Sequence, residues 1–293
     1  MKFFKTVAVL CLIGFAAVSG YTLAHWVVTQ EPPSFINTVI EKQLPSKNVL
    51  VLGTDESRLR SDVMMLGCLN TTTNTIDIIS IPRDTRVRLQ GEYHKINNAL
   101  TFGGGELACS TVQELTGIQV DTYVLIDFNA FGKIIDILGG VDFYVPQNMY
   151  YTDPTQDLVI NLKEGQQHLD GDKAEQLVRY RQYLRGDEDR ISVQRDFIQA
   201  LFEQKLNASI ILKLPQIIGE VFDSVDTNMS MSDMISYASV ASKLNTESLM
   251  TYQLPGAPKT IDGLSYYIAD TEETAALVEQ IKTRTTAQPT PTE

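Results

Sequence analysis

Short apolar runs alternate with helical patterns along most of the chain. Apolar runs bounded by turn residues predict strands at residues 48–55, 63–70, 75–81, 121–128, 141–145, 249–254 and 266–269. Helical periodicity predicts helices that end near residues 116, 138, 178, 242 and 282, the fourth of which is broken at Pro215. Residues 153–162 indicate a hairpin or a peripheral insertion. The alternation predicts an α/β fold, with a mixed central sheet sandwiched by helices.

The helix that starts near Asp187 or Asp189 places two polar residues among apolar ones. At about 100° per residue, one broad face carries Val193, Phe197, Ile198 and Leu201. Arg190 and Gln194 lie near the middle of this face, although the opposite side is polar. A guanidinium that faces a protein core is costly unless it meets a carboxylate or an anion. We therefore expect both side chains to face an internal polar site.

The N-terminal pattern predicts a membrane anchor. Residues 6–28 carry no charge, follow Lys2 and Lys5, and are long enough to cross a bilayer. The lysines place the N-terminus in the cytoplasm and the rest of the chain outside. We thus expect a single-pass cell-membrane protein with a cytoplasmic tail (1–5), an anchor (6–28), a linker (29–46), an extracytoplasmic domain (47–284) and a disordered tail (285–293). A cleaved signal peptide, with small residues near Ala24, is the alternative.

The overall charge narrows the class of partner. The formal net charge of −12 argues against nucleic acid, because no basic face remains outside a few arginine-rich stretches. Three cysteines do not make a disulfide framework, and whether Cys68 and Cys109 pair stays open.

The arginines are clustered, whereas the lysines are scattered singly. Every arginine except Arg284 lies in one of three short stretches. Guanidinium groups suit bidentate recognition of phosphate or carboxylate. For Arg86, Arg88, Arg185 and Arg195 we favour surface ion pairs. An anion site is the preferred interpretation for five others: Arg60, Arg83, Arg179, Arg181 and Arg190.

Carboxylates accompany these arginines where predicted strands end. The candidate polar groups form four sets: Asp55; Arg60 with Asp62; Arg83 with Asp84; and Arg179, Arg181, Arg190 and Gln194. Mg²⁺ commonly binds one or two carboxylates together with phosphate oxygens, and Asp55 and Asp62 are the natural pair. The alternative is that these two aspartates only neutralise Arg60 and Arg83. The composition favours a site for a pyrophosphate bridged by Mg²⁺.

No other catalytic pattern competes with this interpretation. His94 and His168 lack a serine or cysteine motif, and the glycines at 103–105 lack the lysine and serine of a phosphate-binding loop. Direct phosphoryl transfer is the simplest chemistry, with an aspartate taking a proton from an incoming hydroxyl.

Eight motifs in series resemble the LytR-CpsA-Psr family. They are Asn48-Val-Leu-Val-Leu-Gly-Thr-Asp55, Arg60-Ser-Asp-Val-Met-Met65, Ser80-Ile-Pro-Arg-Asp-Thr85, Lys95-Ile-Asn97, Leu138-Gly-Gly-Val141, Leu169-Asp-Gly171, Arg179-Tyr-Arg181 and Asp189-Arg190. The resemblance covers residues 48–202 and is weak beyond residue 205. It implies a membrane-anchored phosphotransferase that moves a glycopolymer, such as teichoic acid or capsular polysaccharide, from a polyprenyl-pyrophosphate carrier to peptidoglycan with Mg²⁺.

The resemblance also implies residue roles. Asp55 and Asp62 would bind Mg²⁺, and Asp62 or Asp84 would be the base, with Arg83 beside them. Those that would hold the pyrophosphate are Arg60, Arg83, Arg179, Arg181 and Arg190, with Gln194 next to them. In this sequence Lys95-Ile-Asn97 is followed by Asn-Ala-Leu where the family more often has Ala-Ala-Tyr, a departure that bears on acceptor contacts.

Three other functions remain open. With water as acceptor, the same site would be a lipid-pyrophosphate phosphatase. A non-catalytic polyprenyl-lipid binder is a second alternative. The third is a membrane-bound transcriptional attenuator, a label often given to the family, although the acidic chain and the predicted export make DNA binding unfavourable.

Overall fold

The computed structural model describes most of the chain after the predicted linker. The described residues are 44–54, 59–120, 122–154, 158–184, 186–205, 217–219, 221–240 and 246–286. The predicted tail, anchor and most of the linker lie outside these ranges, as does Asp55. No helix in the described ranges is long and apolar enough to cross a bilayer.

The described residues form a six-stranded mixed sheet in the order β11-β6-β1-β2-β3-β12. Its strands are β1 (Lys47–Thr54), β2 (Ser61–Asn70), β3 (Thr75–Ser80), β6 (Thr122–Asp127), β11 (Val225–Thr227) and β12 (Leu249–Gln253). β1 and β6 are parallel, as are β3 and β12, whereas β2 runs antiparallel to both of its neighbours. The carboxyl ends of β1, β3, β6 and β12 therefore lie at the same edge of the sheet as the beginning of β2.

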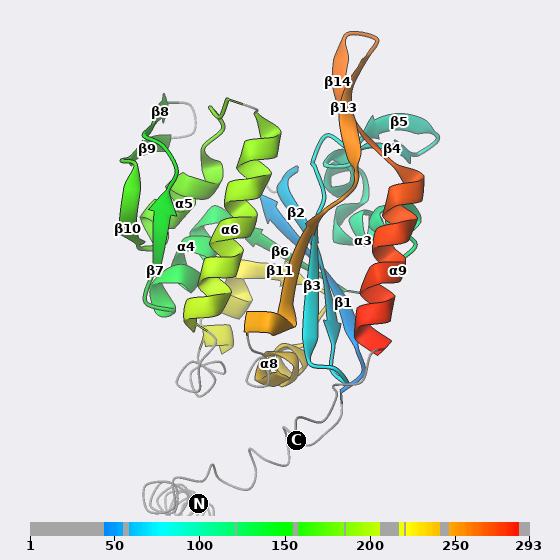
Figure 1. Ribbon diagram of the computed structural model, residues 1–293, viewed down its shortest axis with the longest axis horizontal. Coiled ribbons are helices and arrows are strands. Elements are labelled where there is room, and N and C mark those ends of the chain that lie inside the picture. Colours follow the sequence, from blue (N-terminus) through cyan, green and yellow to red (C-terminus); the bar gives the residue numbers. More distant parts are fainter. Residues whose placement is uncertain are drawn as a thin grey trace, which may run out of the picture. The chain divides into compact units, whose positions relative to one another are not determined.

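Smaller hairpins and strand pairs surround this sheet (Figure 1). They are β4 (Arg86–Leu89) with β5 (Glu92–Lys95), β7 (Val141–Val145) with β10 (Gly165–Leu169), β8 (Met149–Asp153) with β9 (Leu158–Leu162), and β13 (Gly256–Ile261) with β14 (Leu264–Ala269). The helices are α3 (Asn98–Thr116), α4 (Phe128–Ile137), α5 (Gly171–Arg179), α6 (Asp187–Lys205), α8 (Met231–Val240) and α9 (Thr271–Thr286), with 3-10 turns η1 (Phe222–Ser224) and η3 (Thr246–Ser248).

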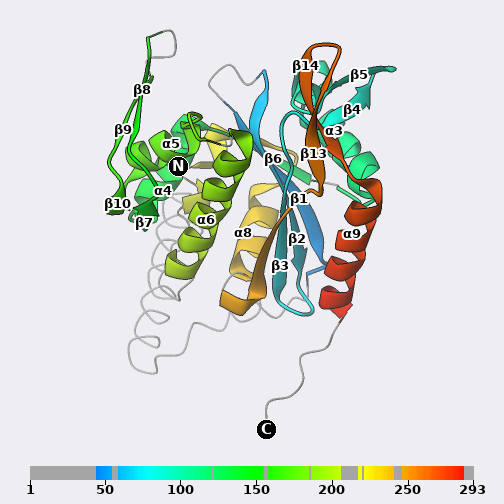
Figure 2. The same ribbon diagram turned by 45° about the horizontal axis from the view of Figure 1, so that its top comes forward.

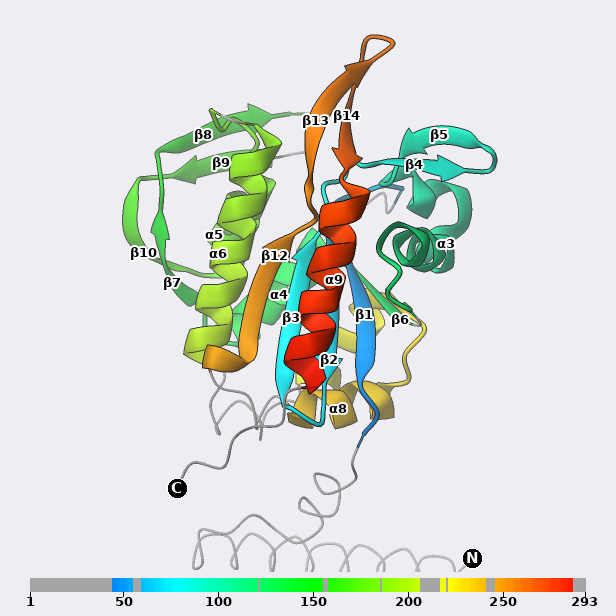
Figure 3. The ribbon, with the colours of Figure 1, turned by 45° about the vertical axis from the view of Figure 1, so that its right-hand side comes forward.

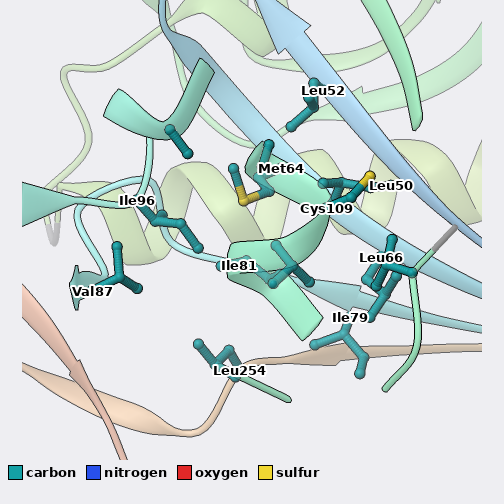
Figure 4. Packing of buried hydrophobic residues seen from close by; sticks show 14 of the residues in the cluster. Leu50, Leu52, Met64, Leu66, Ile79, Ile81, Val87, Ile96, Cys109 and Leu254 are labelled. Carbon is teal, nitrogen blue, oxygen red and sulfur yellow. The ribbon is translucent and has the colours of Figure 1, made fainter. Parts of the chain in front are cut away.

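Helices cover both faces of the sheet, as the sequence predicts. In Figure 3, α9 lies in front of β1, β2 and β3, and in Figure 1 α4 and α6 lie on the opposite side of these strands from α9. α3 and α9 join the core on the first face, where Leu50, Leu66, Ile79 and Cys109 pack together (Figure 4). The second core lies among α4, α5, α6 and the strands β7 to β10, and Phe197 of α6 is fully buried in it. The mixed α/β architecture is thereby confirmed.

Local sequence signals explain where several helices begin and end. The side chain of Asp127 accepts a hydrogen bond from the amide of Ala130 at 2.8 Å and caps α4. Asp170 caps α5 in the same way through the amide of Lys173. α4 is followed by Gly139 and Gly140, which have positive φ and let the chain turn directly into β7.

The structure differs from the sequence-based prediction in several elements. Residues 225–227, predicted as helix, form the edge strand β11 on β6. β4, β5, β10 and β13 were not predicted. β5, β10 and β13 lack a clear apolar alternation, whereas β4 alternates over only four residues, and all four depend on partner strands. α3 begins at Asn98 and is kinked at Gly103 and Gly104 instead of starting after them. α9 continues to Thr286, two residues into the segment predicted as a disordered tail.

Cys68 and Cys109 are buried thiols on the same core, and no disulfide joins them. Burial, assisted by the nearby Asp77 carboxylate, raises the pKa of the Cys68 thiol to about 12. At neutral pH Cys68 is therefore a protonated packing residue.

Candidate functional site

The candidate site is built where strand ends meet at one edge of the sheet. Asp62 is the second residue of β2, and Arg83 and Asp84 follow the end of β3. Because β2 and β3 are antiparallel neighbours, the start of one lies beside the end of the other. The amide of Ile81 donates to the carbonyl of Met64 at 2.9 Å, which extends this pairing towards the site. Figure 2 shows the same edge, with α5 and α6 beside it.

Asp62 is the centre of the site. Arg83 Nη1 donates to Asp62 Oδ1 at 2.5 Å, and Arg181 Nη2 donates to Asp62 Oδ2 at 2.5 Å. Arg190 Nη2 reaches the backbone carbonyl of Asp62 at 3.4 Å. Asp62 thus contacts guanidinium groups from three separate segments, two through its carboxylate and one through its backbone carbonyl. Their combined positive charge exceeds that of the carboxylate, so the cluster can accept a further anion.

Arg179 reaches the same region because the chain straightens after α5. Tyr180, the residue that ends the helix, is extended at φ −65° and ψ 134°. On a continued helix Arg179 and Arg181 would point in nearly opposite directions, so this extended residue lets both face one cavity. Arg179 Nη1 also pairs with Glu175 at 2.7 Å, and its guanidinium lies 4.7 Å from the centre of the Phe128 ring.

Arg190 and Gln194 are buried, as the helix-face argument predicts. Their exposed fractions are 3% and 5%. Gln194 Nε2 donates to the carbonyl of Val178 at 3.0 Å, which ties α6 to the last turn of α5. Beside them, burial raises the pKa of the Tyr183 hydroxyl, so this group stays neutral at physiological pH. Because Arg190 is buried and its Nη2 reaches the backbone carbonyl of Asp62, it contributes positive charge to the cluster from the protein interior.

A cavity of about 260 Å³ opens beside Asp62, and its wall is partly charged and partly apolar. It is lined by Asp62, Arg179, Arg181, Gln182, Phe128, Tyr151 and Leu158. Such a wall suits an amphiphilic anion, with its charge on the arginines and its apolar part against the aromatic and aliphatic side chains. Phe128, Tyr151 and Leu158 were not predicted as site residues, because each looks like an ordinary core or hairpin residue in the sequence.

Asp84 lies next to this cluster in a different environment. Its Oδ2 forms an ion pair with Lys95 Nζ at 3.0 Å, and its Oδ1 lies 3.9 Å from Arg83 Nε. The Arg83 carbonyl accepts from the amide of Asn97 at 3.2 Å, which holds this segment to the turn after β5. Lys95 belongs to a motif quoted above but was given no role, and the structure now brings it to the site.

Two predicted site residues are not placed in the cluster. Arg60 is exposed immediately before β2, and no ion pair joins it to another residue of the described part. Asp55 lies outside the described residues. The alternative interpretation, in which Asp62 only neutralises Arg83, matches the observed pair. It does not account for the second arginine on Asp62, Arg181, or for the adjacent cavity.

The residues at the cavity fit Mg²⁺ only if a bound phosphate supplies part of its ligands. Within the described ranges, no group of three or more His, Cys, Asp or Glu side chains could hold a metal ion. Mg²⁺ usually takes one or two carboxylates and completes its shell with water and phosphate oxygens. Asp62 supplies one such carboxylate at the cavity, so the residues fit an ion that is shared with a bound phosphate.

Comparison with known proteins points to one family. The sequence profile of the LytR_cpsA_psr family matches residues 27–283. The chain is 30% identical over 232 residues to the polyisoprenyl-teichoic acid–peptidoglycan teichoic acid transferase TagV of Bacillus subtilis (strain 168), a match that covers 75% of this chain and 59% of that relative. It is 32% identical over 247 residues to the transferase TagU of Oceanobacillus iheyensis, covering 79% of this chain and 74% of the relative.

A solved structure gives the same answer. The crystal structure of B. subtilis TagV superposes with a TM-score of 0.71 at 26% identity, and the match covers 84% of this chain and 99% of that one. The fold and the sequence relationship therefore extend well beyond residue 205, where the motif resemblance becomes weak.

Proposed function

The chain belongs to the LytR_cpsA_psr family, and from this premise we propose that it transfers a glycopolymer from a polyprenyl-pyrophosphate carrier to peptidoglycan. TagU and TagV, which the chain resembles, are named as teichoic acid transferases of this type. Because the match spans little more than half of TagV, the activity, the donor and the acceptor are proposals for this chain.

The observation that carries the proposal is the Asp62 cluster beside a partly apolar cavity. Arg83 and Arg181 hold Asp62 now, and a pyrophosphate offers the same bidentate oxygen acceptors with more charge. On binding, these guanidinium groups would turn from the carboxylate to phosphate oxygens. Phe128 and Leu158 would contact the first part of the polyprenyl chain. A free nucleotide or inorganic phosphate would leave this apolar wall uncovered.

The reaction is a direct phosphoryl transfer. An acceptor hydroxyl oxygen attacks the phosphorus that carries the glycan, and a new P–O bond forms. The bond from that phosphorus to the bridging pyrophosphate oxygen breaks, so polyprenyl phosphate leaves with the electron pair. Arg179, Arg181 and Arg190 would stabilise the charge that develops on the departing phosphate.

Asp84 is the better placed base. Both carboxylate oxygens of Asp62 accept hydrogen bonds from arginines, whereas Asp84 Oδ1 lies 3.9 Å from Arg83 Nε, beyond hydrogen-bond distance. Asp84 would take the proton of the acceptor hydroxyl while Lys95 keeps its carboxylate oriented. Asp62, with Asp55, would hold Mg²⁺. When bound, the ion would neutralise charge on the pyrophosphate.

The proposed location follows from the substrates. A polyprenyl carrier is confined to a membrane, so an anchor at residues 6–28 would keep the domain close to its donor. The domain would face the outside of the cell, where peptidoglycan lies.

The test uses the full chain in detergent with a polyprenyl-pyrophosphate glycan, Mg²⁺ and soluble peptidoglycan fragments. Arg83→Ala, Arg181→Ala and Asp84→Asn should each lower the transfer rate by about 10² to 10³-fold, because each removes one charged contact or the base. Arg88→Ala is the matched control. This arginine lies on β4 and donates to the carbonyl of Gly91 away from Asp62, so its variant should keep full activity.

The products distinguish the alternatives. Glycan covalently attached to the fragments, and lost in the three site variants, supports the transferase. Release of phosphorylated glycan without attachment would instead indicate a phosphatase. Tight lipid binding with no turnover would leave a lipid binder and overturn the enzymatic proposal.

A further inference from the structure

Asp84 lines a second groove. Its volume is about 190 Å³, and its lining includes Asp84, Glu188, Gln253, Pro258, Ser265 and Tyr266. The groove is formed by the segment after β3, the first turn of α6 and the β13–β14 hairpin. In Figures 1 and 3 this hairpin rises between α6 and the β4–β5 hairpin. Asp84 is the residue that lines this groove and also contacts Arg83 of the Asp62 cluster.

The hairpin that forms this groove is fixed to the site by backbone contacts. The amide of Tyr267 donates to the carbonyl of Asp84 at 2.9 Å, and its hydroxyl donates to the carbonyl of Leu254 at 2.7 Å. On the neighbouring hairpin, the Arg86 guanidinium stacks 3.6 Å from the ring centre of Tyr93 and lies 5.7 Å from that of Tyr266. The hydrogen bonds of Tyr267 fix the backbone next to Tyr266 at the groove.

The chemistry of this groove is opposite to that of the arginine-lined cavity. Two carboxylates, Asp84 and Glu188, line it together with an amide, a hydroxyl, proline and tyrosine. No lysine or arginine is found among its described lining residues. A phosphate would therefore be repelled. A neutral sugar would fit, because its hydroxyl and amide hydrogens can donate to carboxylates while its apolar face packs on an aromatic ring.

From this arrangement we propose that the Asp84–Glu188–Tyr266 groove binds the acceptor saccharide and presents its hydroxyl to Asp84. The inference rests on the proposed transferase function and adds the place of its second substrate. The donor then occupies the cationic side of Asp84 and the acceptor occupies the acidic, aromatic side. The two substrates meet at the carboxylate that accepts the proton. The negative charge of the pyrophosphate disfavours the donor in the acidic groove.

Direct binding tests the groove independently of turnover. The full chain in detergent is titrated with a neutral tetrasaccharide of N-acetylglucosamine as a soluble acceptor analogue, without donor, and the dissociation constant is measured by calorimetry. Tyr266→Ala should weaken binding at least 10-fold, because the stacking surface is lost. Tyr266→Phe keeps the ring and should stay within about 3-fold of the parent. Glu188→Gln should weaken binding at least 5-fold through loss of a charged acceptor.

Two further variants make the outcome decisive. Tyr150→Ala removes an exposed tyrosine from the β8–β9 hairpin and should leave the dissociation constant unchanged. Arg83→Ala should still bind the tetrasaccharide although it no longer transfers. Unchanged affinity in both Tyr266→Ala and Glu188→Gln would overturn the proposal that the groove binds the acceptor, without contradicting the proposed transferase function. Groove-dependent binding by a parent protein that never transfers would overturn the transferase instead. If Tyr266→Ala does not fold, the exposed Glu188→Gln substitution decides.

Discussion

Two aspartates, Asp62 and Asp77, both pair with arginine but have different roles. Asp62 is held by arginines beside a cavity, so its partners can exchange it for a ligand. Asp77 of β3 is fully buried and pairs with Arg284 of α9 at 2.6 Å. Arg284 also donates to the carbonyls of Glu247 and Ser248 at 2.9 Å. The second pair therefore fixes the last helix against the sheet, away from the site.

Removal of Arg284 should destabilise the fold in a pH-dependent way. Burial raises the pKa of Asp77 above its usual value, and Arg284 opposes this rise. In Arg284→Met the folded-state pKa rises further, so the pH-dependent part of the penalty is small near pH 4, where the carboxyl can stay protonated. Relative to the parent, this part grows as pH rises above the parent's own raised folded-state pKa of Asp77, to about 3 kcal/mol at pH 8. Urea unfolding at several pH values measures it.

Two variants control this prediction. Lys282→Met breaks an exposed pair with Glu279 and should change stability by less than about 1 kcal/mol at any pH. Adding Asp77→Asn to Arg284→Met removes the buried charge and should abolish most of the pH dependence. A loss of stability that is equal at pH 4 and pH 8 would contradict the assignment to Asp77.

At the level of elements, the site depends on how closely α4 and α5 approach. Gly171 at the start of α5 lies against Gly132 of α4, and its amide donates to Asp136 Oδ1 at 2.7 Å. α4 carries Phe128 and α5 carries Arg179, which stack on each other at 4.7 Å. The close approach of two helices at glycine thus sets the position of Arg179, which lines the cavity beside Asp62.

Gly171→Ala should therefore affect both stability and donor binding. A Cβ at this position would overlap the Gly132 carbonyl and lie 2.7 Å from Asp136 Oδ2, so α5 must move. Overpacking of this kind costs about 1 to 3 kcal/mol. We expect a lower unfolding midpoint and weaker binding of a polyprenyl-pyrophosphate donor. Gly132→Ala is the matched control, since its Cβ would meet Gly171 at an ordinary 3.6 Å. Equal effects of the two variants would contradict the close-approach argument.

At the scale of the whole molecule, the two hydrophobic cores support different parts of the candidate site. The core between the sheet, α3 and α9 contains much of the sheet that brings Asp62, Arg83 and Asp84 together. The core of α4, α5, α6 and β7 to β10 carries Arg179, Arg181 and Arg190. The Asp62 cluster joins the two parts, so a bound pyrophosphate would bridge residues supplied by both.

The N-terminal segment should be retained in the mature protein. Residues 6–28 form an uncharged run long enough to span the hydrocarbon region, and Lys2 and Lys5 precede it. Mass spectrometry of the protein from host membranes should find an intact chain that resists extraction by alkaline carbonate. A chain whose N-terminus starts near residue 25 would show instead that the run is a cleaved signal peptide. A variant lacking residues 1–28 should appear in the soluble fraction.

Much of the site was predictable because its residues are unusual for their positions. Arg190 and Gln194 interrupt an apolar helix face, and Arg83 and Asp84 directly follow an apolar strand. Lys95 and Glu175 could not be singled out, since single charged residues of this kind are common on surfaces. The groove beside Asp84 was equally inaccessible. Its tyrosine and glutamate lie far from Asp84 in the sequence, and β13 lacks a strand pattern.

The sequence by itself determined the α/β class, the main strands and helices, and the set of arginines and aspartates that form the Asp62 cluster. These features depend on local periodicity, capping and residue type, which act over a few residues. The tertiary structure alone decided which oxygens the arginines contact, that Tyr180 is extended, and that Asp84 lines an acidic groove while its neighbour Arg83 pairs with Asp62. Those outcomes depend on contacts between segments distant in sequence, whose energies arise only when the sheet, helices and hairpins pack together.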